Sequence, residues 1–503
     1  MTIGIWVLGD QLSHQQAALI NYEKHRQQTP IILIESSDYV RQRRYHYQKI
    51  VLVWSAMRHF ANELGSAGWP VTYKISDDFI TSLREWIKDN AISELKVMTP
   101  SDRPFLSLIQ TFELDCSITF VHNNQFLWTH EDFDQWANSR KSLLMEDFYR
   151  KGRKIFNILM DGNQPIGGQW NFDKQNRRPP KDKLLIPKAL WFEPDEITQA
   201  VIEQIRLKNI EGYGRIEPFR WGVTRAQALE VLEHFLSIVF SQFGPYQDAM
   251  VTQEETMWHA LISPYLNLGL LHPLEVIQAA EKAYLEQKIQ LNSVEGFVRQ
   301  ILGWREYMHG IYHFQNEDYA KHNWLEHQET LPSFYWNSSL TEMNCLHQVL
   351  HQVEKTGYAH HIQRLMVLSN FALIIGVLPQ AIESWFHSVF IDAYDWVMQT
   401  NVIGMGQFAD GGILASKPYA ASANYINKMS DYCKNCVYNH KKSIGDDACP
   451  FNYFYWDFLA RHQQKLRSLG RMNLILGNLK RMEPSKLSQM RSQAQLWKKQ
   501  FIT

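Results

Sequence analysis

The sequence predicts an α/β N-terminal domain with a Rossmann-like parallel sheet, then a basic connector, then a large all-α domain. In the first 125 residues, short β-rich segments alternate with longer segments of helical spacing, which is typical of a parallel sheet with helices on both faces. After Tyr246, apolar residues recur every three to four positions almost to the end, which indicates helices. We place the three parts at residues 1–130, 131–240 and 241–503.

Five segments of the first domain are rich in β-branched and apolar residues, and we predict one strand from each: Ile3–Leu8, Ile31–Glu35, Val71–Ile75, Leu95–Met98 and Ile118–Val121. The clearest helix between them covers Tyr45–Leu64. Ligands of parallel sheets bind beyond the carboxyl ends of the strands. Asp10 and Gln11 follow the first strand and Glu35 ends the second, so all three are expected at that edge.

The connector carries positive charge that the whole-chain total conceals. The 503-residue chain has a net charge of −1, which by itself argues against a nucleic-acid partner. Between Ser139 and Lys188, however, 12 Lys and Arg residues stand against five Asp and Glu residues. The Gly- and Pro-rich segment Gly162–Lys188 predicts a long loop with little regular structure. Such a basic loop is either a solvated linker or a phosphate-binding surface.

Composition and segment lengths exclude several other classes of protein. Apolar residues make up 45% of the chain and charged residues 20%, which is ordinary for a globular protein. Five scattered cysteines do not predict a secreted disulfide framework. The N-terminal residues lack signal-peptide features, and the longest apolar run, Phe371–Pro379, is too short to span a bilayer. We expect a soluble, monomeric, cytoplasmic protein without a membrane partner.

Four of the five cysteines are candidate ligands of one metal centre. Cys433, Cys436 and Cys449 form a compact C-x2-C-x12-C group, and Cys345 in the same helical region is the natural fourth ligand. Four thiolates suit either zinc or an iron–sulfur cluster. Because a zinc ribbon uses two C-x2-C pairs, we favour a [4Fe–4S] cluster and keep zinc and unligated thiols as alternatives. Cys116 is expected to be a buried thiol outside this group.

Apolar spacing in the last domain predicts helices over five long segments: Pro273–Leu291, Val294–Phe314, Ser339–Lys355, His361–Ile374 and Pro379–Gln399. Ser263 is expected to cap a helix whose free N–H groups could bind a phosphate. Arg305 and Glu306 interrupt an apolar helix, and the simplest interpretation is a buried ion pair. The segment Asp392–Gly406 is expected to end a helix and enter a glycine-rich turn that could approach a flat cofactor closely.

Several motifs together resemble a known family. They are SPYL at Ser263–Leu266, GWREY at Gly303–Tyr307, the pair His360–His361, NVIGMGQFADGG at Asn401–Gly412, the four cysteines, LGDQL at Leu8–Leu12, MEDFYR at Met145–Arg150 and GGQWNFDKQNRRP at Gly167–Pro179. With them the sequence resembles the photolyase/cryptochrome superfamily and, more narrowly, its iron–sulfur bacterial branch. This branch is also called the prokaryotic (6-4) photolyases or deoxyribodipyrimidine photolyase-related proteins. The resemblance runs nearly from end to end.

The resemblance implies two chromophores besides the cluster. A 6,7-dimethyl-8-ribityllumazine antenna would bind in the α/β domain near Asp10, Gln11 and Glu35. FAD would bind in the helical domain, where the expected binding residues are Ser263, Arg305, Asp395, Asn401, Gly404 and Met405. Trp385 and Trp336 would carry electrons to the flavin. Phe386 departs from the family, in which a tyrosine can stand at this position.

The implied activity is light-driven repair of (6-4) photoproducts in UV-damaged DNA. Excited reduced FAD would donate an electron to a lesion flipped out of the duplex, and a histidine would donate a proton. Adjacent residues of a helix point about 100° apart, so only one histidine of the pair can face the lesion squarely. His361 is the expected proton donor and His360 the second choice. Tyr419 and Tyr425 would line the lesion pocket.

The connector would lie on the DNA, with Arg177, Arg178 and Lys181 on phosphates. Asp173 lies in the same basic loop, where a carboxylate would repel phosphate, so we predict that a bridging Mg²⁺ binds there.

Other activities remain open from the sequence. A blue-light photoreceptor of the cryptochrome type would use the same fold and cofactors, and cyclobutane dimers are an alternative substrate. The histidine pair and Tyr419 favour repair of (6-4) photoproducts over both. A light-independent DNA-binding protein with a structural metal site would account for the basic loop and the cysteines without a flavin.

Overall fold

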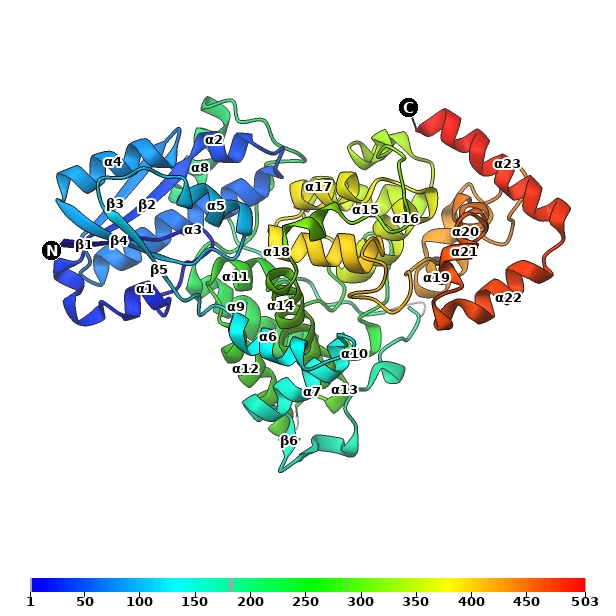
Figure 1. Ribbon diagram of the computed structural model, residues 1–503, viewed down its shortest axis with the longest axis horizontal. Helices are drawn as coiled ribbons and strands as arrows, with labels where there is room; N and C mark the ends of the chain where they lie inside the picture. The colour runs from blue at the N-terminus through cyan, green and yellow to red at the C-terminus, as the bar shows by residue number, and fades with distance from the viewer. Residues whose placement is uncertain (1, 181–183, 287, 503) are drawn as a thin grey trace.

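The computed structural model describes residues 2–180, 184–286 and 288–502, and Figure 1 shows them as three groups of elements. The α/β domain lies at the left of the view, helices from the middle of the sequence lie below, and the later helices lie at the right. Within the described ranges, no helix has both the length and the hydropathy that a membrane crossing requires. Lys181, expected on DNA, lies outside the described residues.

The predicted parallel sheet is present, with five strands in the order β3-β2-β1-β4-β5. The strands are β1 (Thr2–Trp6), β2 (Ile31–Ser36), β3 (Val71–Ser76), β4 (Ile92–Met98) and β5 (Ser117–Val121). Every pairing is parallel; for example, Ile32 lies opposite Thr72 and Trp6 lies opposite Val97. Because β1 is central, the segment that follows it lies at the point where the strand order reverses, which is the usual ligand position in such sheets.

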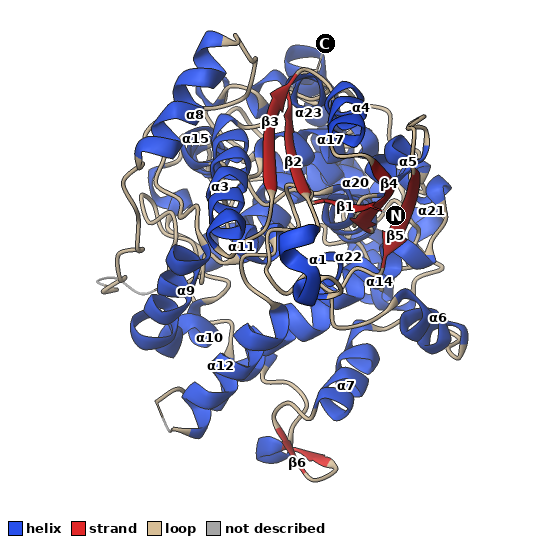
Figure 2. Ribbon diagram, turned by 90° about the vertical axis from the view of Figure 1, so that its left-hand side faces the viewer, coloured by secondary structure: helices blue, strands red, loops and turns tan. Residues whose placement is uncertain are grey.

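Alternate residues of the central strands face two separate apolar layers. Ile5 and Leu33 pack with α3 (Tyr47–Ser66), whereas Trp6 and Ile34 pack with α4 (Phe79–Asp89). Figure 2 shows helices on both sides of the strands. The remaining helices of this domain are short: α1 (Ala17–Ile20), η1 (Glu23–Gln28), α2 (Ser37–Arg41) and α5 (Arg103–Gln110).

The middle of the chain is mostly helical except for its basic loop. Its elements are α6 (His130–Asn138), α7 (Met145–Phe156), β6 (Met160–Asp161), β7 (Gln164–Pro165), η2 (Ile166–Gly168), η3 (Asp173–Gln175), α8 (Glu196–Leu207), α9 (Arg225–His234), η4 (Phe235–Val239), η5 (Phe240–Gln242) and α10 (Phe243–Tyr246). The described part of the predicted loop thus contains only part of a hairpin with two-residue strands and two short 3₁₀ turns. Helix α8 packs against α3 through Val201 and Ile205, so this part of the chain covers the outer layer of the α/β domain.

The rest of the chain is helical, as predicted. The α-helices are α11 (Ser263–Leu268), α12 (Pro273–Leu285), α13 (Leu291–Val298), α14 (Glu306–Phe314), α15 (Asn344–Thr356), α16 (Asn370–Ile375), α17 (Pro379–Val389), α18 (Asp395–Met398), α19 (Ala423–Met429), α20 (Pro450–Arg461), α21 (Gln463–Leu466), α22 (Asn473–Arg481) and α23 (Pro484–Phe501). Among them lie π-helical segments at η6 (Arg299–Arg305), η10 (Gln363–Ser369) and η11 (Gln399–Gly406), and 3₁₀ turns at η7 (Glu317–Lys321), η8 (Ser333–Tyr335), η9 (Ser338–Leu340), η12 (Tyr432–Asn435) and η13 (Gly470–Met472).

Three of the predicted helices are wrong in their bounds. The helix expected over Ser339–Lys355 begins only at Asn344. The helix expected over Pro273–Leu291 ends at Leu285. The helix expected over Pro379–Gln399 is interrupted between α17 and α18, where the backbone N–H of Ile391 bonds to the carbonyl of Gly357 instead of its own helix. Ile391 is buried in this break, so apolar spacing continued through it and gave no sign of the interruption.

Candidate active site

A cavity of about 130 Å³ lies beyond the carboxyl ends of the strands, where the sequence predicted a ligand site. Asp10, Lys49 and Asp102 supply its charged groups. Aromatic side chains form much of the remaining wall: Trp6, Tyr39, Tyr45, Trp54, Phe105 and Tyr394. Burial raises the pKa of Asp10 to about 6 and lowers that of Lys49 to about 7. An aromatic cavity with a few convergent polar groups fits a flat heteroaromatic ligand.

The other two residues expected at this site do not line the cavity. Gln11 is buried, and its Nε2 donates a hydrogen bond of 2.9 Å to the backbone oxygen of Met98. Glu35 is also buried, and its carboxylate accepts hydrogen bonds from Arg58 Nε at 2.7 Å and from the Tyr73 hydroxyl at 2.5 Å. Both side chains are therefore used to hold the strand ends that frame the cavity.

The four cysteines that the sequence grouped line one small cavity. Cys345 comes from the first turn of α15, Cys433 and Cys436 from the region of η12, and Cys449 immediately precedes α20. None of them is in a disulfide. Burial raises the pKa of the Cys433 thiol to about 11 and that of Cys449 to about 12, and neighbouring cysteines add to both shifts. A metal centre would reverse this effect, because coordination deprotonates thiols outright. Cys116 lies apart and packs against apolar residues of the α/β domain, but it is only partly buried, so its expected burial was wrong.

Ser263 is the first residue of α11, and its side chain does not cap the helix, so the expected capping role was wrong. Its hydroxyl instead donates a hydrogen bond of 2.7 Å to Oδ2 of the buried Asp392. Arg364 of η10 contacts both carboxylate oxygens of Asp392, at 2.9 and 3.1 Å. Burial raises the pKa of Asp392, but the Arg364 guanidinium outweighs burial and holds that pKa below its ordinary value. Asp392 is therefore a charged group shared by three segments.

Of two further residues expected near FAD, Arg305 contacts the end of the α/β domain and Asp395 pairs with a tyrosine of α14. Arg305 forms the buried ion pair that the sequence predicted, with 3.0 Å between its Nη1 and Oε1 of Glu306, and its guanidinium lies over the ring of Phe126. Asp395 accepts a hydrogen bond of 2.5 Å from the Tyr312 hydroxyl. Burial raises the pKa of Asp395.

The expected glycine-rich turn is instead the π-helical segment η11, which contains Asn401, Gly404 and Met405. A Cβ at Gly404 would lie 2.3 Å from the hydroxyl of Tyr319, so this glycine makes room for Tyr319. The side-chain amide of Asn401 donates a hydrogen bond of 2.8 Å to the carbonyl of Val397 in the preceding turn. π-Helical turns are frequent at functional sites, and η10 and η11 both border this part of the domain.

Buried polar atoms in the same region have no protein partner. Both ring nitrogens of His360, directly before the helical segment that contains η10, and Oε1 of Gln407, directly after η11, have no hydrogen-bond partner among the described residues. Buried polar atoms are nearly always satisfied in native proteins, so such atoms indicate a ligand or ordered water. Together with Ser263, Arg364 and Asp392, these groups fit a polar heteroaromatic cofactor.

Trp385 and Trp336 approach each other through Tyr335. The fully buried Trp385 donates from its Nε1 to the carbonyl oxygen of Tyr335 at 2.9 Å, and the two rings lie 5.1 Å apart. Trp336 is the next residue in the chain and is partly exposed, with its ring 5.7 Å from that of Tyr213. Phe386 packs against Trp385 at 5.3 Å. Trp385 and Tyr335 are thus in ring contact, and the partly exposed Trp336 adjoins Tyr335 through the backbone.

The two adjacent histidines diverge, as expected. His360 is buried, and its ring stacks on His259 with 4.5 Å between the centroids. His361 is exposed, with its Nε2 3.6 Å from Oδ1 of Asp248. Asp248 also contacts Arg177, whose Nε lies 3.9 Å from Oδ2. The arrangement places an accessible imidazole, a carboxylate and a guanidinium on one surface.

Tyr425 and Tyr419 lie at the same surface. Burial raises the pKa of Tyr425, and a hydrogen bond to the Asp248 carboxylate raises it further. Burial also raises the pKa of Tyr419, on which the charges of Arg177 and Asp173 act in opposite directions. The structure therefore brings together around Asp248 the residues that the sequence proposed for the lesion pocket and one of those proposed for DNA.

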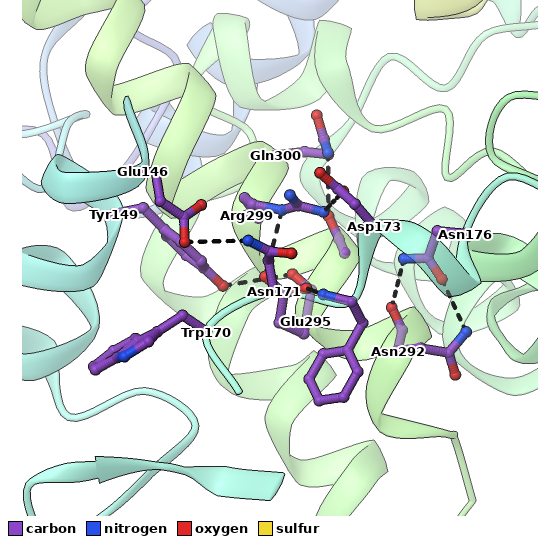
Figure 3. Close-up of polar contacts among 12 residues, drawn as sticks. Glu146, Tyr149, Trp170, Asn171, Asp173, Asn176, Asn292, Glu295, Arg299 and Gln300 are labelled. Carbon is purple, nitrogen blue, oxygen red and sulfur yellow. Dashed lines mark hydrogen bonds and ion pairs between the residues drawn. The ribbon is translucent and has the colours of Figure 1, made fainter. Parts of the chain in front are cut away.

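Figure 3 shows how the basic loop is held in place. Asp173 forms an ion pair with Arg299 of η6, whose Nε lies 3.3 Å from Oε1 of the buried Glu295. The second oxygen of Glu295 accepts a hydrogen bond of 3.1 Å from the backbone N–H of Phe172. Burial raises the pKa of Asp173, but Arg299 outweighs burial and lowers it overall. The loop is therefore docked on α13 and η6 through buried charges.

A reciprocal amide pair completes the docking. Asn176 Nδ2 donates to the carbonyl of Asn292 at 3.0 Å, and Asn292 Nδ2 donates to Oδ1 of Asn176 at 2.9 Å. Beyond this pair the chain returns to the surface, where Arg177 and Arg178 are exposed. The two arginines are thus presented to solvent from an anchored backbone.

Sequence reasoning missed Asp248 and His259. Both lie in the irregular segment between α10 and α11, which carries no periodic pattern. His259 stands four residues before the SPYL motif, which is the only signal that could have singled it out. Asp248 is one carboxylate in an otherwise apolar and amide-rich stretch, and its role depends on contacts with residues more than 70 positions away in either direction.

Comparisons with known proteins agree with this architecture. The family model described as deoxyribodipyrimidine photo-lyase-related protein matches residues 5–221. A protein of Agrobacterium fabrum named (6-4) photolyase is 44% identical over 498 residues, covering 97% of this chain and 98% of its own.

Two crystal structures share the fold at low sequence identity. A bacterial class III photolyase from Agrobacterium tumefaciens superposes with a TM-score of 0.58 at 16% identity, over 93% of this chain and 98% of its own. A cryptochrome from Synechocystis sp. PCC6803 superposes with a TM-score of 0.55 at 14% identity, over 85% of this chain and 88% of its own.

The amide pair that docks the loop can be tested by replacing Asn176 with alanine. The change leaves a buried amide of Asn292 without its acceptor, which should lower the free energy of unfolding by about 1–3 kcal/mol. It should also speed tryptic cleavage after Arg177, because the loop opens more often. Urea unfolding and limited proteolysis measure the two effects, with Gln175→Ala at the exposed neighbouring position as the matched control. Equal cleavage rates in the two variants would contradict the anchoring role.

Proposed function

Because this chain belongs to the deoxyribodipyrimidine photolyase-related family, we propose that it is a DNA photolyase that uses light to repair (6-4) photoproducts. One observation carries the choice of lesion: an exposed imidazole, His361, lies with Tyr425 around Asp248 on one surface, next to the exposed Arg177. A lesion flipped out of the duplex needs a proton donor at the mouth of the pocket and a cation for the adjoining phosphate. His361, Tyr425 and Arg177 supply these groups.

The flavin is proposed to lie in the part of the helical domain bordered by α11, η10 and η11. When bound, FAD supplies the light-absorbing and electron-donating group. Ser263, Arg364 and the ring nitrogens of His360 are the polar groups available to it there. Asp392 pairs with Arg364 through both carboxylate oxygens, and the apolar core around α16 and α17 excludes water.

His361 is proposed to hold the proton for the lesion at Nε2. Asp248, 3.6 Å away, orients the ring and provides a negative partner for the imidazolium. His360 is buried and stacked on His259, so it is better placed to position its neighbour and the cofactor than to meet the lesion. We therefore assign His360 a positioning role and His361 the role of proton donor.

Trp385 and Trp336 are proposed to carry electrons inward to the flavin. Phe386 is harder to oxidise than the tyrosine that can stand at this position in the family. Tyr335 contacts Trp385 and is covalently continuous with Trp336, so it is the aromatic residue best placed to replace that tyrosine.

The four-cysteine cavity is proposed to hold a [4Fe–4S] cluster. The sulfurs of a tetrahedral zinc site, with Zn–S bonds of about 2.3 Å, lie about 3.8 Å apart. Among the described residues, the groups of potential ligands whose atoms all lie within 4.8 Å of one another contain histidines and carboxylates but no cysteines. The wider cysteine spacing supports a polynuclear cluster over a single zinc ion. The aromatic cavity at the sheet edge is proposed to bind the 6,7-dimethyl-8-ribityllumazine antenna.

A Mg²⁺ ion is proposed at Asp173, with Asp248 as a second ligand. Both carboxylates lie within 4.0 Å of the Arg177 guanidinium, at 4.0 and 3.9 Å respectively. If Arg177 turns onto a DNA phosphate, both carboxylates lose this cation, and Asp173 keeps only its ion pair with Arg299. Oxygen donors of this kind suit Mg²⁺, which also tolerates phosphate in its coordination shell.

The repair activity is tested with reduced protein, blue light and an oligonucleotide that contains one (6-4) photoproduct. Chromatography of the digested product should show restored thymines for the wild-type protein. His361→Asn should lower the rate by roughly 10²- to 10⁴-fold, the usual contribution of a general acid. His351→Asn is the matched control, because His351 is equally exposed and lies 3.7 Å from a carboxylate on a different surface. Failure of the wild-type protein to restore thymines would overturn the proposal and favour a photoreceptor.

The Mg²⁺ proposal is tested by measuring the same repair rate with MgCl₂ and with EDTA. EDTA should slow the wild-type protein, while Asp173→Asn and Asp248→Asn should be slow in both conditions because the ligands are missing. Asp161→Asn, an exposed carboxylate of the same region, should behave as the wild type. If the wild-type repair rate is the same with and without EDTA, the proposed site at Asp173 and Asp248 holds no functional cation.

The cluster is predicted to be structural, because its ligands join α15 to a segment about 90 residues later. Cys433→Ser should lose iron and lower the melting temperature, whereas Cys116→Ser, outside the cavity, should do neither. Iron analysis and thermal unfolding measure both effects. Soluble Cys433→Ser protein with unchanged melting would contradict the structural role.

A further inference from the structure

Three histidines outside the proposed active site have ring nitrogens close to one another, and the rings of His130 and His313 stack with 3.9 Å between their centroids. His130 is the first residue of α6, and His309 and His313 lie one turn apart on the same side of α14. One ring nitrogen of each lies within 4.8 Å of those of the other two. We propose that these three imidazoles bind one divalent transition-metal ion, with Zn²⁺ as the expected metal.

Close packing of the two helices creates this arrangement. A Cβ at Gly310 of α14 would lie 2.0 Å from the ring of Phe133, so only glycine lets α6 approach so closely. Phe133 is buried and lies three residues after His130, on the same face of α6. The apolar contact that buries Phe133 therefore brings His130 next to the two histidines of α14, so the three rings are gathered by packing alone.

The surroundings fix two of the rings. Phe126 stacks on His309 with 3.4 Å between centroids and an angle of 9° between the ring planes. The backbone of Ser101 is a hydrogen-bond partner of His313, while Nε2 of His313 is buried and lacks a partner among the described residues. Metal-ligating histidines commonly bond a backbone carbonyl through one ring nitrogen and the metal through the other. His313 is arranged in this way.

The charges around the site select the class of metal. The group of side chains close enough to share one ion holds three imidazoles and no carboxylate, and neutral imidazole is a common metal ligand. Arg103 and Arg305 also face the cluster and disfavour a cation held by charge alone. Mg²⁺ and Ca²⁺, which need oxygen ligands, are therefore excluded, whereas Zn²⁺ readily binds three imidazoles and keeps a fourth position for water.

A bound ion would join the start of the middle region to the helical domain. It would cross-link α6 and α14 without contacting His361, Asp248 or the cysteine cavity, so the proposal is independent of the repair activity. The expected consequence is greater thermal stability, because the ion binds the folded chain and not the unfolded one.

Zn²⁺ binding is tested by calorimetric titration of the full-length holoprotein after treatment with a chelator. One Zn²⁺ should bind per wild-type chain, and His130→Gln and His313→Gln should each weaken binding by at least about tenfold. His351→Gln is the matched control: it disrupts the surface pair His347–His351, which has the same one-turn spacing on a helix but is not in a three-ligand group. It should leave the affinity unchanged. Absence of binding to the wild type, or wild-type affinity in both variants, would overturn the proposal.

Thermal unfolding provides a second readout that does not depend on the titration. Without zinc, His313→Gln should melt close to the wild type, which shows that it folds. Added ZnCl₂ should raise the melting temperature of the wild type and leave that of the variant unchanged. An equal rise in both would show that zinc acts elsewhere, for example at the cysteines, and would contradict the assignment.

Discussion

The buried ion pair between Arg364 and Asp392 constrains the assembly of the helical domain. Removing two charges from water is expensive, and the cost is offset only when the geometry is good and the remaining hydrogen bonds are made. Here Arg364 contacts both carboxylate oxygens and Ser263 donates a further hydrogen bond. To present Asp392 to these partners, the chain leaves the helix between α17 and α18. After that break, Asp395 accepts a hydrogen bond from Tyr312 of α14.

The basic loop is also held in place by buried charged residues. Its composition is typical of a solvated linker. Its backbone is nevertheless hydrogen-bonded to the buried Glu295, and its Asp173 is paired with Arg299. Arg299 thus pairs with the negative charge of Asp173, while Arg177 stays exposed. A cation held on an anchored backbone costs less conformational entropy when it meets a phosphate than one on a free chain. The docking therefore fixes the position at which this positively charged loop presents Arg177 to solvent.

Much of the architecture could be predicted from the chain alone. Strands and helices depend on local periodicity, so the parallel sheet and the helical domain followed from spacing. The four-cysteine group followed from short intervals and one remote partner. Helix breaks could not be predicted, because Ile391 is buried in the break and keeps the apolar pattern. Glycines were also misleading: Gly404 makes room for Tyr319, a packing partner 85 positions away that no local pattern reveals.

The sequence by itself determined the fold class, the family and the residue types available for chemistry. Only the tertiary structure decided which of them meet. Asp248 joins His361, Tyr425 and Arg177, and His130 joins two histidines of α14, through contacts between segments far apart in the chain. Periodicity records how a residue relates to its own helix or strand. A site depends on how separate elements pack, and that is set by buried surfaces and charges that a linear pattern does not contain.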